Sequence, residues 1–591
     1  MRSALSILLM IVVVAGAEII PATNRIDWSL YSGIPGGIPH RTTIYTNLPA
    51  GLSMATINSA IANCPSNQVV QLSNGIYTVT ASLAPKSHIT LRGQGSNTII
   101  QASTDWIMEA ADYRYFWDKA NDITVTSGYG SGSSNLVLAS VPAGLDVGCI
   151  FVITELNDTW VTSCGWEDCA TCALSVDCDL PYLDGTRVRG QVLEITGITD
   201  QTNIAFWPPL SIGFKAGLIP KMSYFAMQET VDRNVMSYFG IEDMLITNTA
   251  SPGNAVLWFS FASHIWVSNV IFRSSFGDIP AIRGDVVFRL QVEHCDFANS
   301  GNNGVGILTM GNCDSWLMEN NIFHVLDRTF LANGAGGHHV FAYNYTHGKT
   351  NSSTECVPPP CVTAAKAELW QHRSHPMFIL FEGNSAWSAN MDNIHGSGSH
   401  FLFLRNHMKG WQEWETWAPY CISIDAWNYW CSIVGNVFGY SGITTNANGL
   451  TFAYEKSSLG NCANKGDVTP RNVLTWGWSG GAAWTNDTYC KASATVTGNY
   501  DYMRNSNHWD AAIEDHVVPN SYFYASKPSW FGFLTWPPVN NDNPDYSSSI
   551  TNIPAGYRYT FGTNPPPADG VAAPRNLRII GTTRAGTVRG P

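Results

Sequence analysis

An asparagine that recurs after short apolar strands is the feature that most constrains this sequence. Between about residues 240 and 440, an apolar-x-apolar segment repeatedly runs into an Asn, which a second apolar pair often follows. The repeat members are Asn248, Asn269, Asn321, Asn344, Asn384, Asn406 and Asn436, with Asp296 in the apparent gap. Successive members are 21, 27, 25, 23, 40, 22 and 30 residues apart. A minimum near 22 with longer steps is typical of a three-strand coil with variable loops.

The chemistry of asparagine explains why it suits such a repeat. At a tight turn between two strands it tolerates the left-handed conformation. Its amide can also hydrogen-bond to the equivalent amide one coil above and one coil below, so that stacked amides satisfy each other inside the solenoid. The repeat therefore predicts stacked coils with an internal ladder of asparagines.

The start of the chain contains further elements of this kind. Met54–Cys64 has the spacing of a short amphipathic helix, and Gln68–Leu72, Gly75–Val79 and Ile89–Gly95 are short strands separated by turn residues. With the asparagine repeat, they resemble the pectin-lyase-like superfamily over roughly residues 50–510. The resemblance implies an all-β fold, a right-handed single-stranded parallel β-helix. It leaves the activity open, because that superfamily includes lyases, inverting hydrolases, epimerases, tailspikes and adhesins.

One stretch interrupts the repeat and sets the expected domain organisation. Residues 121–222 carry apolar strands and a cysteine cluster but no ladder asparagine, which indicates an inserted, disulfide-stapled antiparallel β module. The expected segments are a signal peptide (1–17), an N-terminal extension with a capping helix and the first coils (18–120), the inserted module (121–222), the main parallel β-helix (223–510), a C-terminal strap (511–561) and a Pro/Gly-rich tail (562–591).

The N-terminal residues and the cysteines predict a secreted protein. A twelve-residue apolar run ends in Ala15-Gly16-Ala17, a small-x-small cleavage site, and no later segment is long and apolar enough to span a bilayer. Fourteen cysteines fit an oxidising compartment. The cysteines considered for disulfides are a cluster of Cys164, Cys169, Cys172 and Cys178, and the pairs Cys356/Cys361, Cys421/Cys431 and Cys462/Cys490. Half a zinc site or a redox dithiol is the alternative for Cys169-x-x-Cys172.

Charge and composition restrict the partners. Charged residues make up 13% of the chain, the net charge is −13, and no Lys/Arg run is present. Such a chain cannot gain the counterion-release energy that dominates nucleic-acid binding, and its acidity argues weakly against a strongly anionic polymer. Aromatic residues make up 12%, which fits a sugar that stacks on aromatic faces.

The longest loops of the repeat hold most of the candidate functional residues. Met391–His400 combines Asp392, two histidines, hydroxyls and glycines beside Arg405. We interpret Asp392, His395, Arg405 and Glu382 as candidate catalytic residues of an acid/base centre acting on a sugar. A hydrogen-bonded loop that closes a coil is the alternative. The candidate substrate-binding residues are His372, His400, Lys409, Trp411, Glu413 and Trp414.

Two reactions make different demands on these residues. Inverting hydrolysis needs two carboxylates about 6.5–9.5 Å apart, for which Asp392, Glu382, Glu368, Glu413 and Glu415 are candidates. β-Elimination needs a base that removes the proton α to a uronate carboxyl and a cation that neutralises this carboxylate. Arg405, His395 and Lys409 would serve.

The sequence therefore predicts a secreted enzyme that cleaves a polysaccharide by hydrolysis or elimination in a β-helix groove. A non-catalytic adhesin or structural β-helix that binds glycans is the alternative. We expect a monomer that binds a polysaccharide, without nucleic-acid binding or membrane insertion. Calcium enters as a cofactor candidate because lyases of the resembled superfamily often use it, although no Asp-x-Asp-x-Asp run is present.

Overall fold

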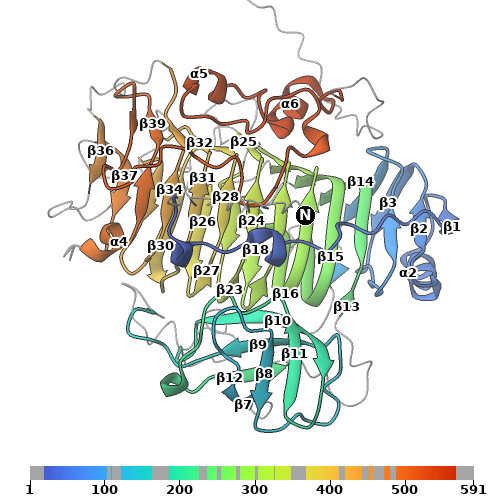
Figure 1. Cartoon of the computed structure of the whole chain (residues 1–591). Helices are drawn as coiled ribbons and strands as arrows, with labels where there is room; N and C mark the ends of the chain where they lie inside the picture. The colour runs from blue at the N-terminus through green and yellow to red at the C-terminus, as the bar shows by residue number, and fades with distance from the viewer. Residues whose placement is uncertain are drawn as a thin grey trace, which may run out of the picture.

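The fold is the right-handed parallel β-helix that the resemblance implies (Figure 1). Strands of successive coils pair in parallel and form three sheets, here numbered 1 to 3 in the order in which a coil of the main helix visits them. The computed structural model describes residues 19–102, 108–109, 122–162, 185–224, 236–248, 255–274, 280–299, 304–324, 326–347, 368–410, 420–441, 452–456, 471–479 and 487–567.

The strands of each sheet follow one another along the helix axis. Sheet 1 contains β6 (Met108–Glu109), the first parts of β15 (Leu257–Ser274) and β16 (Pro280–Glu293), β18 (Val305–Met310), β22 (Arg328–Ala332), β26 (Leu369–Arg373), β30 (Ala389–His395), β33 (Ile422–Ile424), β37 (Arg471–Trp476) and β36 (Phe452–Lys456). Sheet 2 contains β1 (Ile44–Leu48), β2 (Val69–Leu72), β4 (Thr90–Arg92), the first part of β14 (Gly240–Asn248), later parts of β15 and β16, β20 (Leu317–Glu319), β24 (Val340–Ala342), β28 (Leu380–Glu382), β31 (Leu402–Leu404), β34 (Ser432–Val434) and β38 (Thr495–Thr497). Sheet 3 contains β3 (Gly75–Val79), β5 (Thr98–Ala102), the ends of β14 and β15, β17 (Asp296–Asn299), β21 (Ile322–His324), β25 (Tyr345–His347), β29 (Ser385–Ala386), β32 (His407–Met408), β35 (Val437–Phe438) and β39 (Asn499–Asp501), with β40 (Ser506–His508) antiparallel to β39. The short strands β13 (Met236–Ser237), β19 (Cys313–Asp314), β23 (Gly336–Gly337) and β27 (Pro376–Met377) lie at the corner between sheets 1 and 2.

The interior of the helix is filled by side chains that stack from coil to coil. Phe297 lies 4.8 Å from Phe272 and 4.7 Å from Phe323, ring centre to ring centre, with nearly parallel planes. Phe381 and Phe403 repeat this contact at 4.7 Å. Because residues of equal register lie directly above one another, one apolar residue per coil at a given position is enough to build a continuous core.

The asparagine ladder is confirmed from Asn321 onward. The side-chain amide of each ladder residue donates to the Oδ1 of the next at 2.9–3.1 Å, and each backbone N–H does so at 2.8–3.1 Å. The chain of amides runs through Asn321, Asn344, Asn384, Asn406, Asn436 and Asn499. All six residues are buried, so the predicted ladder gains Asn499 as a further member.

The first three predicted ladder residues, Asn248, Asn269 and Asp296, do not occupy the ladder position of their coils. In the coil before Asn321 the ladder position is taken by Cys295, whose backbone N–H donates to Asn321 Oδ1 at 2.9 Å. Asp296 is the next residue and pairs with an arginine instead. Asn269 sits one place too early, with φ of 58°, and Asn248 is the last residue of β14. In the ladder coils the left-handed residue is the one before the asparagine, as in Asn320 (φ 51°) and Tyr343 (φ 55°), so the ladder asparagines do not themselves adopt the left-handed conformation that the sequence suggested. Because asparagine also suits that preceding position, the local pattern does not separate the two.

A capping helix and an N-terminal segment cover parts of the coils. Helix α2 (Met54–Asn63) confirms the predicted helix, and its Ser53 Oγ accepts from the Thr56 backbone N–H at 3.3 Å. The N-terminal segment, which includes α1 (Trp28–Tyr31), runs across sheet 2 (Figure 1). The Trp28 indole N–H donates to the Phe378 carbonyl at 2.7 Å and fixes this segment to the helix.

The inserted antiparallel module is confirmed as a closed barrel. Its strands are β7 (Asp122–Ser127), β8 (Asn135–Leu138), β9 (Ile150–Thr154), β10 (Gly190–Ile198), β11 (Asn203–Trp207) and β12 (Lys221–Tyr224). The barrel has its own core, which includes Phe151, Leu193 and Phe206. In Figure 1 it lies below the helix, with β10 next to β23.

The C-terminal residues lie along the opposite side of the helix from the barrel (Figure 1). They include the helices α5 (Pro544–Ser547) and α6 (Pro554–Phe561). Helix α4 (Thr488–Ala492) precedes them and lies between β37 and β38 of the last coil. The guanidinium of Arg558 in α6 donates to the Asn320 side-chain Oδ1 (2.8 Å) and to the Asn320 backbone carbonyl (2.6 Å). We call residues 509–561 the strap.

The predicted Cys421–Cys431 disulfide is wrong. Both residues carry free thiols buried in the helix interior, where Cys421 Sγ contacts the Met408 carbonyl and Cys431 Sγ the Tyr429 carbonyl. Cys490 is also a free, buried thiol, while its predicted partner Cys462 lies outside the described residues. The signal peptide, the cysteine cluster from 164 to 178, the pair Cys356/Cys361 and the tail beyond residue 567 lie outside them too. In the part of the chain that the structure describes, no helix is long and apolar enough to cross a membrane.

Buried histidines predict a loss of stability in acid. Burial lowers the pKa of six histidines to about 3: His264, His294, His339, His375, His400 and His407. Because the ordinary value near 6.5 applies in the unfolded chain, the unfolded state takes up protons first as the pH falls. We therefore expect the denaturant midpoint to fall steadily from about pH 6.5 to about pH 3. A midpoint that stays constant from pH 7 to about pH 4 would contradict the neutral, buried state of these rings.

Candidate active site

The outer face of sheet 1 brings three of the predicted residues together. Leu369 of β26 and Ala389 and Met391 of β30 point into the core. Because side chains alternate between the two faces of a strand, the residues at odd offsets from these three point outward. His372 and Asp392 are such residues, and one coil separates them. The register pairs Gln371 with Met391, a step of 20 residues, which places the neighbouring outward side chains beside each other.

Asp392 is the centre of this group. Its Oδ2 lies 2.6 Å from His372 Nδ1 and also accepts from the Trp370 indole N–H at 2.5 Å. Its Oδ1 accepts from the Ile394 backbone N–H at 3.1 Å. The carboxylate side chain is 1% exposed, whereas the His372 side chain is 24% exposed. Asp392 therefore fixes the imidazole from behind, with the His372 proton on Nδ1 and the Nε2 lone pair free to act as a base.

His395 lies beside this dyad. Its ring centre is 4.7 Å from that of His372, edge to face, and Arg373 is its partner in the strand pairing. Burial lowers the pKa of His395 to about 4, with further lowering from His372 and Arg373 and an opposing effect of Asp392. The ring is therefore neutral at pH 7 and adds no positive charge beside His372.

An aromatic and cationic wall borders the histidines. The guanidinium carbon of Arg328 lies 4.7 Å from the centre of the Trp370 ring, and the Trp370 ring meets His372 at 5.4 Å. Arg328, Trp370, His372, Arg373 and His395 are all partly exposed. This face thus offers a planar aromatic surface and two guanidinium groups next to two imidazoles, a combination suited to a sugar that carries a carboxylate.

Two carboxylates of this face lie one coil apart. Asp425 lies one coil beyond Asp392 in the outward row, since its backbone N–H donates to the Met391 carbonyl at 2.9 Å. Asp392 and Asp425 are both fully buried. Inverting hydrolysis needs a carboxylate that activates a water molecule next to the sugar, whereas His372 is a partly exposed group of this face that can act as a base.

Glu382 and Arg405 do not join this group, although the sequence suggested it. Glu382 lies on sheet 2, where it accepts from Tyr343 Oη and Ser521 Oγ, both at 2.5 Å, and from the Tyr522 backbone N–H at 2.9 Å. Burial raises its pKa, and these hydrogen bonds and Arg405 act against that rise. Both residues face the strap, so the prediction that they lie beside Asp392 is wrong.

Arg405 is a strap anchor. Its guanidinium donates to the carbonyls of Val518 (2.7 Å), Pro519 (2.7 Å) and Val539 (3.0 Å). Its long-range partners come from two separate parts of the strap, so one side chain holds both against the helix. Burial lowers the pKa of Arg405 to about 10, and Glu382 opposes this.

We expect Arg405→Met to loosen the strap. The substitution keeps an apolar stem but removes three charged hydrogen bonds, which should weaken strap docking by about 2–5 kcal/mol. Limited proteolysis and amide hydrogen exchange over residues 518–539 measure the effect. The control is Arg504→Met, which removes a partly exposed pair with Asp501 in the same region and should change little. Unchanged protection in Arg405→Met would refute the anchor.

The remaining predicted binding residues lie elsewhere or outside the described residues. His400 is buried at the corner between sheets 1 and 2, stacked on Phe378 at 4.4 Å and on Trp430 at 5.1 Å. Lys409 is buried between the rings of Tyr345 (5.1 Å) and Trp387 (5.2 Å), and burial lowers its pKa to about 8. Trp411, Glu413, Trp414 and Glu415 lie outside the described residues.

Glu368 lies beside Lys409 rather than at the histidine group. It accepts from the Trp387 backbone N–H at 2.7 Å and from the Thr346 hydroxyl. Burial raises its pKa. Lys409 acts against this rise, so the two buried groups lie close enough to affect each other's pKa.

The calcium candidate finds no support in the described ranges. There, no group of three or more His, Cys, Asp or Glu side chains is placed to hold a metal ion. Asp392 is already committed to an indole, an imidazole and a backbone N–H, and a histidine-rich set is a poor match for a cation that prefers oxygen ligands. The chemistry derived below uses no metal.

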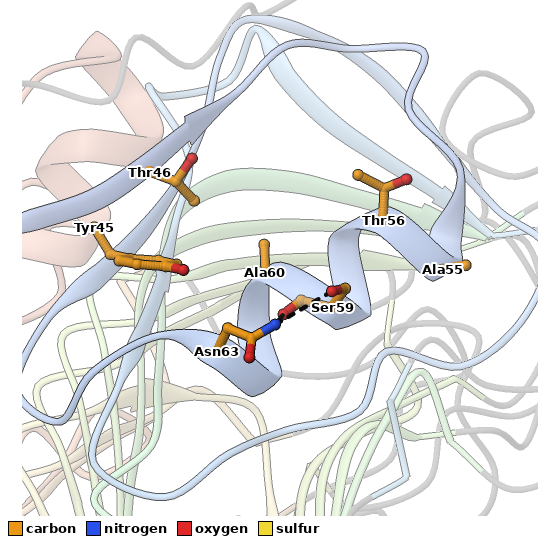
Figure 2. Close-up of a pocket in the computed structure, with 7 residues that line it drawn as sticks. All are labelled: Tyr45, Thr46, Ala55, Thr56, Ser59, Ala60 and Asn63. Atoms are coloured by element: carbon orange, nitrogen blue, oxygen red, sulfur yellow. Dashed lines mark hydrogen bonds between the residues drawn. The ribbon is translucent and has the colours of Figure 1, made fainter.

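Two hollows lie away from the histidine group. The first, of about 640 Å³, lies between β1 and α2 (Figure 2). Its lining has no carboxylate, imidazole or cation: Tyr45, Thr46, Ala55, Thr56, Ser59, Ala60 and Asn63. The second, of about 520 Å³, lies where the N-terminal segment, the barrel and the strap meet, and Trp207, Glu319 and Tyr524 are among its lining residues. Neither contains a base and a cation in the arrangement found on sheet 1.

Arg328 is the residue of the site that the sequence did not reveal. It lies at the start of β22, outside the loops with the longest steps of the repeat. The signal that could have found it is the strand register, which pairs β22 with β26 and so brings residues 328–332 next to residues 369–371. Trp370 and Arg373 lie in the 40-residue step between Asn344 and Asn384, but no role was predicted for them.

Comparisons with known proteins return distant structural likenesses. No family model matches the chain, and no curated protein matches it. Solved structures similar to this chain include the gp49 tailspike of Pseudomonas phage LKA1, at 12% identity and a TM-score of 0.42, covering 72% of each chain. The Gp54 tailspike of Acinetobacter baumannii bacteriophage AP22, in complex with A. baumannii capsular saccharide, matches at 12% identity and a TM-score of 0.41, covering 78% of this chain and 66% of that one. A PL6 alginate lyase in complex with a trisaccharide matches at 9% identity and a TM-score of 0.34, covering 81% and 83%. Because these identities and TM-scores are low, the fold is assigned from the strand pairing of this chain itself.

Proposed function

We propose that the protein is a polysaccharide-cleaving enzyme that acts by β-elimination on a chain containing uronate residues. The observation that carries the proposal is the dyad of Asp392 Oδ2 and His372 Nδ1, 2.6 Å apart, on an outward sheet face beside His395 and Arg373. A buried carboxylate that fixes a partly exposed imidazole provides a base of defined tautomer. The residues 1–17 predict secretion, which would bring the enzyme to such polymers.

The residues divide the reaction between them. His372 Nε2 removes the proton α to the uronate carboxyl, the bond to the leaving sugar oxygen breaks, and a carbon–carbon double bond forms. Arg373 is the cation proposed to neutralise the uronate carboxylate, which acidifies the proton to be removed. His372, protonated by that step, is proposed to pass the proton on to the leaving oxygen, and His395, neutral at pH 7, adds no second positive charge beside it.

Trp370 and Arg328 support substrate placement rather than proton transfer. The Trp370 ring is partly exposed and held in place by its hydrogen bond to Asp392. A sugar face stacked on this ring would lie next to His372, whose ring is 5.4 Å away. Arg328, above the same ring, is placed to contact a second carboxylate of the polymer.

A polymer panel tests the proposal. Purified mature protein is incubated with uronate-containing and neutral polysaccharides, and chain cleavage is followed by viscosity and product size. We expect cleavage of at least one uronate polymer and of none of the neutral ones. Cleavage confined to neutral polymers would overturn the assigned chemistry. Binding without cleavage across the panel would favour the glycan-binding adhesin instead.

A further inference from the structure

A serine, a histidine and a carboxylate form a hydrogen-bonded chain where the barrel meets the helix. Ser211 lies in the connection between β11 and β12 of the barrel, His338 directly follows β23, and Asp314 ends β19. The Oγ of Ser211 lies 2.7 Å from His338 Nε2, and His338 Nδ1 lies 2.8 Å from Asp314 Oδ1. A hydroxyl bonded to an imidazole, with a third group orienting the imidazole, is the geometry that activates a serine nucleophile.

The imidazole of this chain is fixed on every side. Asp314 also accepts from Ser315 Oγ (2.8 Å) and from the Val192 backbone N–H (3.1 Å), which hold the carboxylate in one orientation. As an acceptor, it places the His338 proton on Nδ1 and leaves Nε2 to accept from Ser211 at 2.7 Å, a shorter contact than the 3.3 Å from Ser211 Oγ to its other acceptor, Gln191 Oε1. The ring is stacked on Tyr31 at 5.1 Å with planes 18° apart. The base therefore has a single tautomer and a single orientation.

The bond between Ser211 and His338 does not by itself require this third member. A serine–histidine bond would satisfy both groups, whereas a buried carboxylate adds a desolvation cost of several kcal/mol. His375 shows the simpler arrangement, since its ring nitrogens lie 3.1 Å from Ser399 Oγ and 3.4 Å from Ser397 Oγ. The Asp314 side chain is 1% exposed and that of His338 is fully buried. Asp314 Oδ2 contributes to barrel docking through Val192, whereas Oδ1 orients His338 and supplies the group that the His375 arrangement lacks.

We infer that Ser211 is the nucleophile of a second active centre, which hydrolyses esters of small carboxylic acids. Ser211 is the one partly exposed member of the three, whereas His338 and Asp314 are buried, so the substrate is proposed to carry a compact acyl group. Esters are favoured over amides because an alcohol leaves more readily than an amine. This centre is independent of the polysaccharide chemistry proposed for sheet 1.

The reaction proceeds through an acyl-enzyme. The Ser211 Oγ bonds to the ester carbonyl carbon while its proton passes to His338 Nε2. The tetrahedral intermediate expels the alcohol, which takes the proton from His338, and leaves the acyl group on Ser211. Water then attacks this ester, with His338 again taking and returning a proton, and releases the carboxylic acid and free Ser211.

A serine-directed fluorophosphonate probe tests the inference on the full mature chain. We expect covalent labelling that peptide mass spectrometry maps to Ser211, and slow hydrolysis of p-nitrophenyl acetate. Ser211→Ala should abolish both, and Asp314→Asn should lower ester turnover about 10⁴-fold. The matched control is Ser131→Ala, because the Ser131 hydroxyl donates to the Ser211 carbonyl but does not contact His338. It should retain labelling and turnover.

The wild-type labelling decides the outcome even where a variant fails to fold. Absence of label on Ser211 in wild-type protein of intact near-ultraviolet circular dichroism would overturn the inference and leave the three residues as a docking contact. Labelling and ester hydrolysis that persist in folded Ser211→Ala would do the same, because the nucleophile would then be another serine.

Discussion

Replacing Asp392 with Asn is expected to lower the kcat for polysaccharide cleavage by about 10²–10⁴-fold, the range of positioned acid–base catalysis. The amide can still occupy the space of the carboxylate, but it cannot stabilise the protonated His372 ring. It can also turn its NH₂ toward His372 Nδ1, which reverses the tautomer and removes the Nε2 lone pair that the reaction uses. Initial rates on a polymer that the wild type cleaves measure this effect.

The matched control for this variant lies on the same sheet. Asp285 accepts from the Trp258 indole N–H, as Asp392 accepts from that of Trp370, but its other partner is Arg283 rather than an imidazole. Asp285→Asn therefore removes a similar indole contact without touching a histidine. We expect it to retain the wild-type rate. A similar loss in both variants would mean that the effect is structural, and full activity in Asp392→Asn would remove the dyad from the mechanism.

The second large effect is expected for Asn406→Ala, which cuts the asparagine ladder. Asn406 donates to the Phe381 carbonyl and to Asn436 Oδ1, and accepts from the backbone and side-chain N–H groups of Asn384. Alanine removes four buried hydrogen bonds and leaves the Asn384 donors without an acceptor. At about 1 kcal/mol for each bond, with about 1–3 kcal/mol more for buried donors left unsatisfied, the expected loss of unfolding free energy is at least about 4 kcal/mol.

Denaturant unfolding measures this loss, and an exposed asparagine supplies the comparison. Asn135 lies in the barrel, exposed, with its amide bonded only to Ser134 Oγ at 3.4 Å. Asn135→Ala should change stability by no more than about 0.5 kcal/mol. A loss below about 1 kcal/mol in Asn406→Ala would show that the stacked amides are not a main source of stability.

The fold could be predicted because its main constraint repeats locally. Each coil needs one residue whose side-chain amide bonds to its equivalent above and below, and Asn321 to Asn436 carry that requirement in the sequence itself. The register of the first coils could not be predicted, because Asn269 meets the turn requirement one position early while Cys295 supplies only its backbone N–H to the ladder.

The candidate site was predicted in part for a similar reason. Asp392 and His395 stand three residues apart, at the end of β30 in the structure, so their proximity is visible in the sequence. The third member, His372, depends on the length of one coil, which the pairing of Gln371 with Met391 fixes at 20 residues. Arg405 was misplaced because its partners, Val518, Pro519 and Val539, lie more than 100 residues away in a strap without periodicity.

The number of unsaturated uronate ends formed for each new reducing end tests the central claim most directly. It is measured on the wild-type digest of a uronate polymer, with absorbance for the double bond and a reducing-end assay on the same sample. Elimination by the His372–Asp392 dyad predicts one unsaturated end for every bond cleaved. Reducing ends that accumulate without unsaturation would contradict the account, because they would show that water, and not an imidazole acting on the uronate, breaks the chain.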